Sequence, residues 1–140
     1  MFNSPPGPEN LKSKKESIDA RIAFLEKYGA KVELDKPTVD AYRLTFSYED
    51  AVVTIRIALN DYGGADVIIT NMTTLPDSQK DMGFGSKALQ SVLSWAANNF
   101  KDIRAVQVQE PSENFWIKNG FTKCEDPNPT NDFIYRTSAK

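Results

Sequence analysis

The chain has 140 residues, 40% of them apolar, and a net charge of −2, which predicts one domain with a core of its own. A slightly acidic chain lacks the clustered Lys and Arg that neutralise phosphates, so we do not expect it to bind nucleic acid. It has no histidine and one cysteine, Cys124, which excludes Ser-His-Asp and Cys-His catalysis and an intrachain disulfide, and argues against a metal site.

The N-terminal region divides into a tail and a helix. Residues 1–9 are rich in Pro, with Asn, Ser and Gly between them, which predicts a flexible tail before a single domain over residues 10–140. Over residues 10–28 the apolar positions fall on one helical face, and Gly29 is a suitable end. These positions are Leu11, Ile18, Ile22 and Leu25. The narrow stripe predicts a surface helix laid on a sheet, and a contact in a homodimer is the alternative.

The middle of the chain has the period of β-strands. Apolar and polar residues alternate over residues 42–46 and 51–59, and residues 47–50 between them suit a hairpin turn. A third strand is predicted over residues 67–75, where Pro76 and its polar neighbours end it.

The remaining elements alternate between helix and strand. A broad apolar face over residues 83–100 predicts a helix buried against a sheet. Residues 103–108 suit an inner strand, 112–119 a short helix, and 121–124 and 133–135 two last strands. This order predicts an α/β or α+β mixed sheet with helices on both faces.

A glycine-rich loop follows the third predicted strand. Gly83-Phe84-Gly85 opens the long helix, and the first N–H groups of a helix have no partner within it. Together with the helix dipole they attract anions, and glycines let a phosphate approach the backbone. The loop therefore predicts a phosphate site, with a plain turn as the alternative.

Two segments resemble the GNAT family of N-acetyltransferases. Lys80-Asp81-Met82-Gly83-Phe84-Gly85-Ser86 is similar to the family's acetyl-CoA loop, Arg/Gln-x-x-Gly-x-Gly/Ala, with Lys80 in the first position, where it keeps a charge but loses the planar fork. Residues 111–121 are similar to the family's late helix, Ala-x-x-Phe-Tyr-x-x-x-Gly-Phe. The resemblance covers roughly residues 41–136, and the family's usual first strand and paired helices are abbreviated or absent.

The resemblance implies a GNAT-like acyl-CoA acyltransferase fold with acetyl-CoA as the acyl donor. The strands that end at Leu75 and Gln109 would splay apart, and the donor would enter between them. The backbone around residues 73–75 would bond the pantetheine arm, the N–H groups of residues 81–86 would hold the pyrophosphate, and the late helix would flank the thioester. The implied donor-binding residues are Thr73, Thr74, Leu75, Lys80, Asp81, Met82, Gly83, Phe84, Gly85, Ser86, Asn114 and Trp116.

The resemblance also implies that a primary amine attacks the thioester directly in a ternary complex. Glu110 is the first choice for the base, with a solvated loop carboxylate as the alternative reading. The family's acid, a Tyr, is replaced by Trp116, whose indole is not an acid, so Ser112 and Tyr135 are the substitute donors. Asn71 would orient a water or the substrate.

A second function stays open at this point. Because Lys80 and Trp116 stand where the family usually has other residues, the chain is alternatively a catalytically silent GNAT-fold module that binds a partner or senses CoA. The amine acceptor, small molecule or protein, is not specified by the sequence. No apolar run reaches the roughly 20 residues that cross a bilayer. With no apolar signal core and one thiol, we expect a cytoplasmic protein that does not engage membranes.

Overall fold

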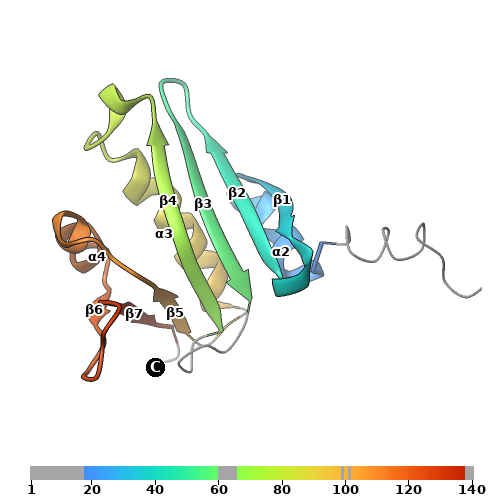
Figure 1. Ribbon diagram of the computed structural model, residues 1–140. Coiled ribbons are helices and arrows are strands. Elements are labelled where there is room, and N and C mark those ends of the chain that lie inside the picture. The colour runs from blue at the N-terminus through green and yellow to red at the C-terminus, as the bar shows by residue number, and fades with distance from the viewer. Residues whose placement is uncertain (1–17, 60–65, 99, 101, 138–140) are drawn as a thin grey trace, which may run out of the picture.

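A computed structural model describes residues 18–59, 66–98, 100 and 102–137. Within these ranges seven strands form one sheet in the order β1-β2-β3-β4-β5-β7-β6 (Figure 1). The strands are β1 (Ala30–Lys36), β2 (Ala41–Ser47), β3 (Val52–Leu59), β4 (Val67–Leu75), β5 (Asp102–Ala105), β6 (Thr122–Lys123) and β7 (Phe133–Arg136). The helices are α2 (Ala20–Ala23), α3 (Phe84–Ala97) and α4 (Glu113–Lys118), with 3-10 turns η1 (Phe24–Tyr28), η2 (Pro37–Val39), η4 (Asp77–Gln79) and η5 (Glu110–Ser112). The predicted mixed α/β fold is confirmed.

The predicted N-terminal helix is shorter than expected where it is described. Asp19 caps it by accepting a hydrogen bond from the Arg21 N–H at 2.8 Å, and α2 gives way to the 3-10 turn η1 after one turn. Gly29, with φ of 100°, ends the segment as predicted. The tail over residues 1–9 and the first part of the predicted helix lie outside the described residues.

Strand β1 corrects the expectation of an abbreviated or absent first strand. It pairs antiparallel with β2 from Ala30 to Lys36, with one register shift at Asp35, and only η2 connects the two. The acidic residues of β1 point away from the core and meet arginines of β2 and β3. Glu33 lies 3.2 Å from Arg43 and Asp35 4.0 Å from Arg56. The alternate apolar residues Ala30 and Val32 are buried in the core, which accounts for the strand, and the ion pairs satisfy the charges on its other face.

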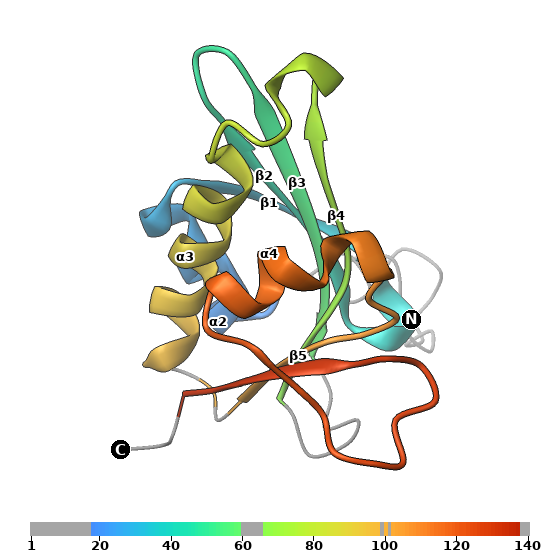
Figure 2. The ribbon, with the colours of Figure 1, turned by 90° about the vertical axis from the view of Figure 1, so that its left-hand side faces the viewer.

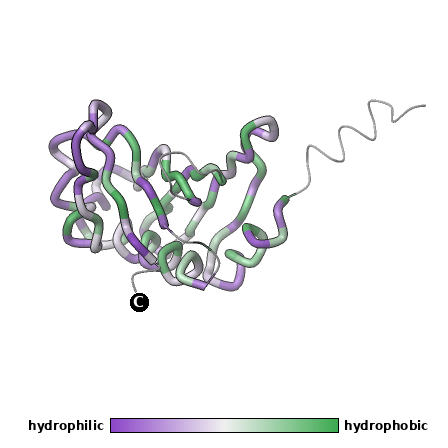
Figure 3. Tube along the Cα trace, turned by 90° about the horizontal axis from the view of Figure 1, so that it is seen from below, coloured by the Kyte–Doolittle hydropathy of each residue, from purple (hydrophilic) through white to green (hydrophobic). Residues whose placement is uncertain are grey.

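The core lies between the sheet and α3. Alternate residues of β2 and β3 are fully buried on that side, and so are Leu89, Val92 and Trp95 of α3. Figure 2 shows α2 and α3 on one side of the four long strands. Figure 3, coloured by hydropathy, shows hydrophobic and hydrophilic residues interspersed along the chain. The opposite face of β1–β4 carries no helix among the described residues, so the prediction of helices on both faces is wrong. That face presents polar side chains such as Arg43, Thr54 and Arg56, together with a small apolar cluster around the buried Ala58 and Ile68.

The described ranges contain no helix with the length and apolar character needed to span a bilayer. The longest, α3, has 14 residues.

Strands β4 and β5 separate after a short parallel pairing. They pair only from Val67 with Ile103 to Ile69 with Ala105, whereas β4 continues to Leu75. A bulge at Thr70 bends β4 at this point. The sequence predicted a strand over residues 103–108, but β5 ends at Ala105. Beyond Ile69, the edge of β4 that faces β5 therefore has no strand partner among the described residues.

Candidate functional site

A cavity of about 510 Å³ lies where β4 and β5 separate. Its walls are the free edge of β4, the loop that enters α3, and α4 with the turn before it. Figure 1 shows this arrangement, with α4 across the opening from β4. Two stretches that are separate in the sequence, residues 72–86 and 111–118, thus share one site.

The loop wall presents unpaired backbone donors. Gly83 is the N-cap of α3, with φ of 92° and no side-chain cap, and the first helical bond runs from the Lys87 N–H to the Gly83 carbonyl at 3.0 Å. The N–H groups of residues 84–86 therefore have no partner within the helix. The left-handed Gly83 followed by a right-handed Phe84 turns successive N–H groups toward one side, as in anion-binding nests.

The two glycines of the loop serve different needs. A Cβ on Gly83 would meet nothing within 4 Å, so its requirement for glycine is conformational. A Cβ on Gly85 would lie 3.2 Å from the Met72 side chain and 3.5 Å from the Phe115 ring. Gly85 therefore lies where α3 packs closely against both β4 and α4.

The charged residues of the cavity are two lysines and one aspartate. Lys80, Lys118 and Asp81 line it. Lys80 pairs with Asp77 at 3.5 Å, but both side chains are largely exposed, so this ion pair contributes little and Lys80 is available to a ligand. The lining is therefore slightly positive beside the unpaired N–H groups.

Helix α4 is fixed by aromatic and amide contacts. Trp116 is buried, lines the cavity and packs edge-on against Phe115 and Phe121, with ring centroids 5.2 and 5.0 Å apart. Asn119, the C-cap of α4, donates a hydrogen bond to the Ser86 hydroxyl of α3 at 3.1 Å. This hydrogen bond joins the end of α4 directly to the first turn of α3.

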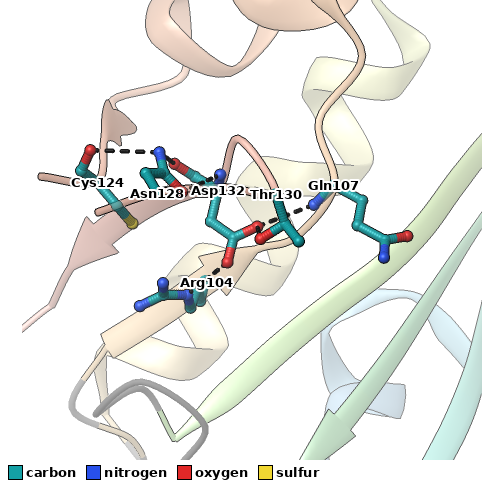
Figure 4. Close-up of polar contacts among 6 residues, drawn as sticks. All are labelled: Arg104, Gln107, Cys124, Asn128, Thr130 and Asp132. Carbon is teal, nitrogen blue, oxygen red and sulfur yellow. Dashed lines mark hydrogen bonds and ion pairs between the residues drawn. The ribbon is translucent and has the colours of Figure 1, made fainter. Parts of the chain in front are cut away.

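Asp132 holds the chain away from β4 at the end of β5. Its carboxylate accepts hydrogen bonds from the Gln107 N–H at 3.0 Å, the Thr130 hydroxyl at 2.8 Å and Arg104 at 3.1 Å (Figure 4). Gln107 has φ of 56°, a left-handed conformation that breaks the extended strand. Burial by itself would raise the pKa of Asp132, but these hydrogen bonds and the Arg104 charge lower the pKa overall. This buried carboxylate positions the far wall of the cavity.

Most residues of the predicted donor site do line this cavity. From the implied set they are Thr73, Thr74, Lys80, Asp81, Gly83, Gly85, Ser86, Asn114 and Trp116. Three do not line it. The side chains of Leu75 and Met82 are exposed to solvent outside the cavity lining. The ring of Phe84 packs against the Tyr48 ring, with centroids 5.3 Å apart.

Only one of the three predicted catalytic residues lines the cavity. Ser112 lines the cavity, whereas Glu110 and Asn71 do not. Glu110 is exposed at the start of η5, and Asn71 is exposed on β4 opposite Arg56. The ring of Tyr135 packs on Phe121 and is also absent from the lining.

Sequence reasoning missed four lining residues, Met72, Pro111, Phe115 and Lys118. A signal for Lys118 was present, because it follows Asn114 by four residues and so shares its helix face. Met72 is inward on β4, two residues before the predicted Thr74.

No family model and no curated protein matches the chain. Solved structures do, among them the KacTA–DNA complex, with a TM-score of 0.51 and 17% identity over 71% of this chain and 68% of that one. AtaTR bound with AcCoA matches with a TM-score of 0.47 and 17% identity over 71% of this chain and 68% of that one. Nourseothricin acetyltransferase matches with a TM-score of 0.42 and 10% identity over 94% of this chain and 95% of that one. The first of these similarities, with the strand order and the splayed β4–β5 pair, shows that the chain has the GNAT acetyltransferase fold.

Proposed function

We propose that the chain is an acetyl-CoA-dependent N-acetyltransferase that acts on a primary amine. The observation that carries the proposal is the cavity at the splay of β4 and β5, where unpaired N–H groups of α3 lie at one side and the unpaired edge of β4 at the other.

The cavity suits the parts of an acyl-CoA. The first turn of α3, with Lys80, supplies donors and positive charge for the pyrophosphate. The free edge of β4 at Thr73 and Thr74 offers backbone groups to the two amides of a pantetheine arm, which can bond there like an added strand. Asn114 and Trp116 would flank the thioester.

The chain would act mainly by positioning. When bound, acetyl-CoA supplies an activated acyl group, and holding an amine beside it removes much of the entropic barrier. Ser112 is the predicted proton donor that lines the cavity, and it lies one helical turn before Trp116. We propose Glu110, two residues before Ser112 at the start of η5, as a base that acts through water.

A second candidate is CoA binding without turnover. The observation that favours it is that Trp116 occupies the acid position and neither Glu110 nor Asn71 lines the cavity. A regulatory module needs only the donor-binding half of the site.

The first test of the proposal is a thermal-shift titration with acetyl-CoA and CoA. A ligand that binds only the native state raises the melting temperature, by an amount that grows with ligand concentration. We expect both ligands to raise the melting temperature. When primary amines are then added to the protein with acetyl-CoA, we expect CoA to be released, which its free thiol reports. A rise without thiol release on a broad amine panel would support the module. No rise at millimolar ligand would contradict both functions.

Lys80→Ala is expected to weaken CoA binding by about fivefold at low salt, because an exposed cation contributes a modest, screened attraction to phosphate. The dependence of affinity on salt concentration should become shallower. The matched control is Lys87→Ala, which removes the same charge from the first turns of α3, where Lys87 lies over the Tyr48 ring outside the cavity. Equal losses in the two variants would show that Lys80 makes no direct contact.

A further inference from the structure

The side chain of Asn119 connects the two helices that border the cavity. It is 7% exposed, and its Nδ2 donates to the Phe115 carbonyl at 2.8 Å and to Ser86 Oγ at 3.1 Å. Its Oδ1 accepts a hydrogen bond from Gln90 Nε2 at 2.9 Å. Every polar atom of this amide therefore has a partner on α3 or α4.

The direction of each of these hydrogen bonds is fixed by chemistry. A backbone carbonyl can only accept, so the atom of Asn119 that faces Phe115 must be the amide nitrogen. That nitrogen carries two hydrogens and no usable lone pair, so both bonds run outward from it. Ser86 Oγ can consequently act only as the acceptor toward Asn119.

The hydroxyl hydrogen of Ser86 is then left for another acceptor. Ser91, further along α3, donates its hydroxyl to the carbonyl of Lys87, four residues back, at 3.3 Å. Ser86 makes no such bond to any residue in the part of the chain that the structure describes, and it lines the cavity beside the unpaired N–H groups of α3. Its free hydrogen is available to a ligand.

We infer that Asn119 is a positioning residue that holds Ser86 as a hydrogen-bond donor to an anionic phosphate group in the cavity. The inference rests on the proposed function, because it assigns the pyrophosphate of the acyl-CoA as the acceptor. A phosphate oxygen accepts hydrogen bonds at neutral pH, so it is a suitable acceptor for the Ser86 hydrogen that the bond from Asn119 leaves unused.

The test is a double-mutant cycle on the affinity for CoA and for dephospho-CoA, which lacks the 3′-phosphate. Ser86→Ala should weaken both by about tenfold, as expected for a hydrogen bond to a charged group, and Ser86→Thr should restore binding. In Asn119→Asp the new carboxylate has no hydrogen to give, so it captures the Ser86 hydroxyl. The loss should be at least tenfold, and adding Ser86→Ala should then cost little more.

Gln90→Ala is the matched control, because it removes a member of the same network while both bonds from Asn119 Nδ2 remain. It should bind CoA like the parent protein. Wild-type affinity in Ser86→Ala, or losses that simply add in the double variant, would overturn the inference while the proposed function stands. Absence of CoA binding by the parent protein would overturn the proposed function and the inference with it.

Discussion

Gly83→Glu is expected to weaken CoA binding by about 100-fold, roughly 2.7 kcal/mol. A side chain on Gly83 would enter open space at the N-terminus of α3, beside the unpaired N–H groups. A carboxylate there would bond those donors itself and repel the phosphate. Isothermal titration of CoA into the parent protein and the variant measures the loss directly. Gly83→Gln, which has nearly the same size without the charge, should lose less.

The strain of the substitution needs a control of its own, and Gly29 supplies it. Gly29 has nearly the same backbone conformation, with φ of 100° against 92°, and a Cβ there would also meet nothing within 4 Å. Both glutamate variants should therefore lose similar stability, about 1–2 kcal/mol for a left-handed residue. Only Gly83→Glu should lose affinity for CoA. Equal affinity in the two variants would show that the glycine loop is a turn and not a ligand site.

The elements that the sequence predicted well are those specified by local pattern. The apolar face of α3 and the alternation in β2, β3 and β4 come from neighbouring residues, and each element formed close to its expected bounds. Strand β1 shows the same alternation of Ala30, Val32 and Leu34. It was missed because its intervening charges argue against a strand until their arginine partners on β2 and β3 are known.

The residue at which β5 ends could not be predicted from its neighbours in the sequence. Residues 106–108, Val-Gln-Val, continue the β-branched run of the predicted strand, but the Gln107 N–H bonds to Asp132, which is 25 residues away. The strand that the sequence predicts as far as Val108 is therefore interrupted at Gln107 by its contact with the Asp132 carboxylate. The opening of the cavity depends on this tertiary contact, and the sequence indicated it only through the family resemblance.

The site predictions show what a motif specifies and what it leaves open. The motif indicates a backbone path, so the turn at Gly83 and the start of α3 followed from it. Side-chain directions did not follow, because Phe84 turns to Tyr48 and Met82 to solvent. The N–H groups of these residues stay predicted ligands of the pyrophosphate, since a side chain can point away while its backbone faces the site.

Asp132→Asn is expected to lower the free energy of unfolding by about 3 kcal/mol, the usual loss when one partner of a buried ion pair is removed. Asp132 is 1% exposed and accepts hydrogen bonds from Arg104, Thr130 and the Gln107 N–H. An amide has one acceptor oxygen in place of two, so at least one buried donor loses its partner. Urea denaturation of the parent protein and the variant measures the difference.

Asp102→Asn is the matched control for burial. Asp102 is also nearly buried, at 4% exposure, but Oδ1 has no hydrogen-bond partner among the residues that the structure describes, and Oδ2 lies 3.7 Å from Arg136, which is mostly exposed. Its loss should be below about 1 kcal/mol. If the two variants were equally destabilised, burial of an aspartate and not the three hydrogen bonds would account for the effect of Asp132.

The pH dependence of the same pair of proteins separates charge from packing. The pKa of Asp132 is lower in the folded protein than its ordinary value of 3.8, so the unfolded chain binds the proton more readily. The stabilisation by its charge is therefore complete above that ordinary value and is lost as pH falls through the folded pKa. The stability difference between the parent protein and Asp132→Asn should be constant near neutral pH and shrink in acid below about pH 4. A difference that persisted unchanged in acid would mean that shape, rather than the ionised carboxylate, holds Gln107 away from β4.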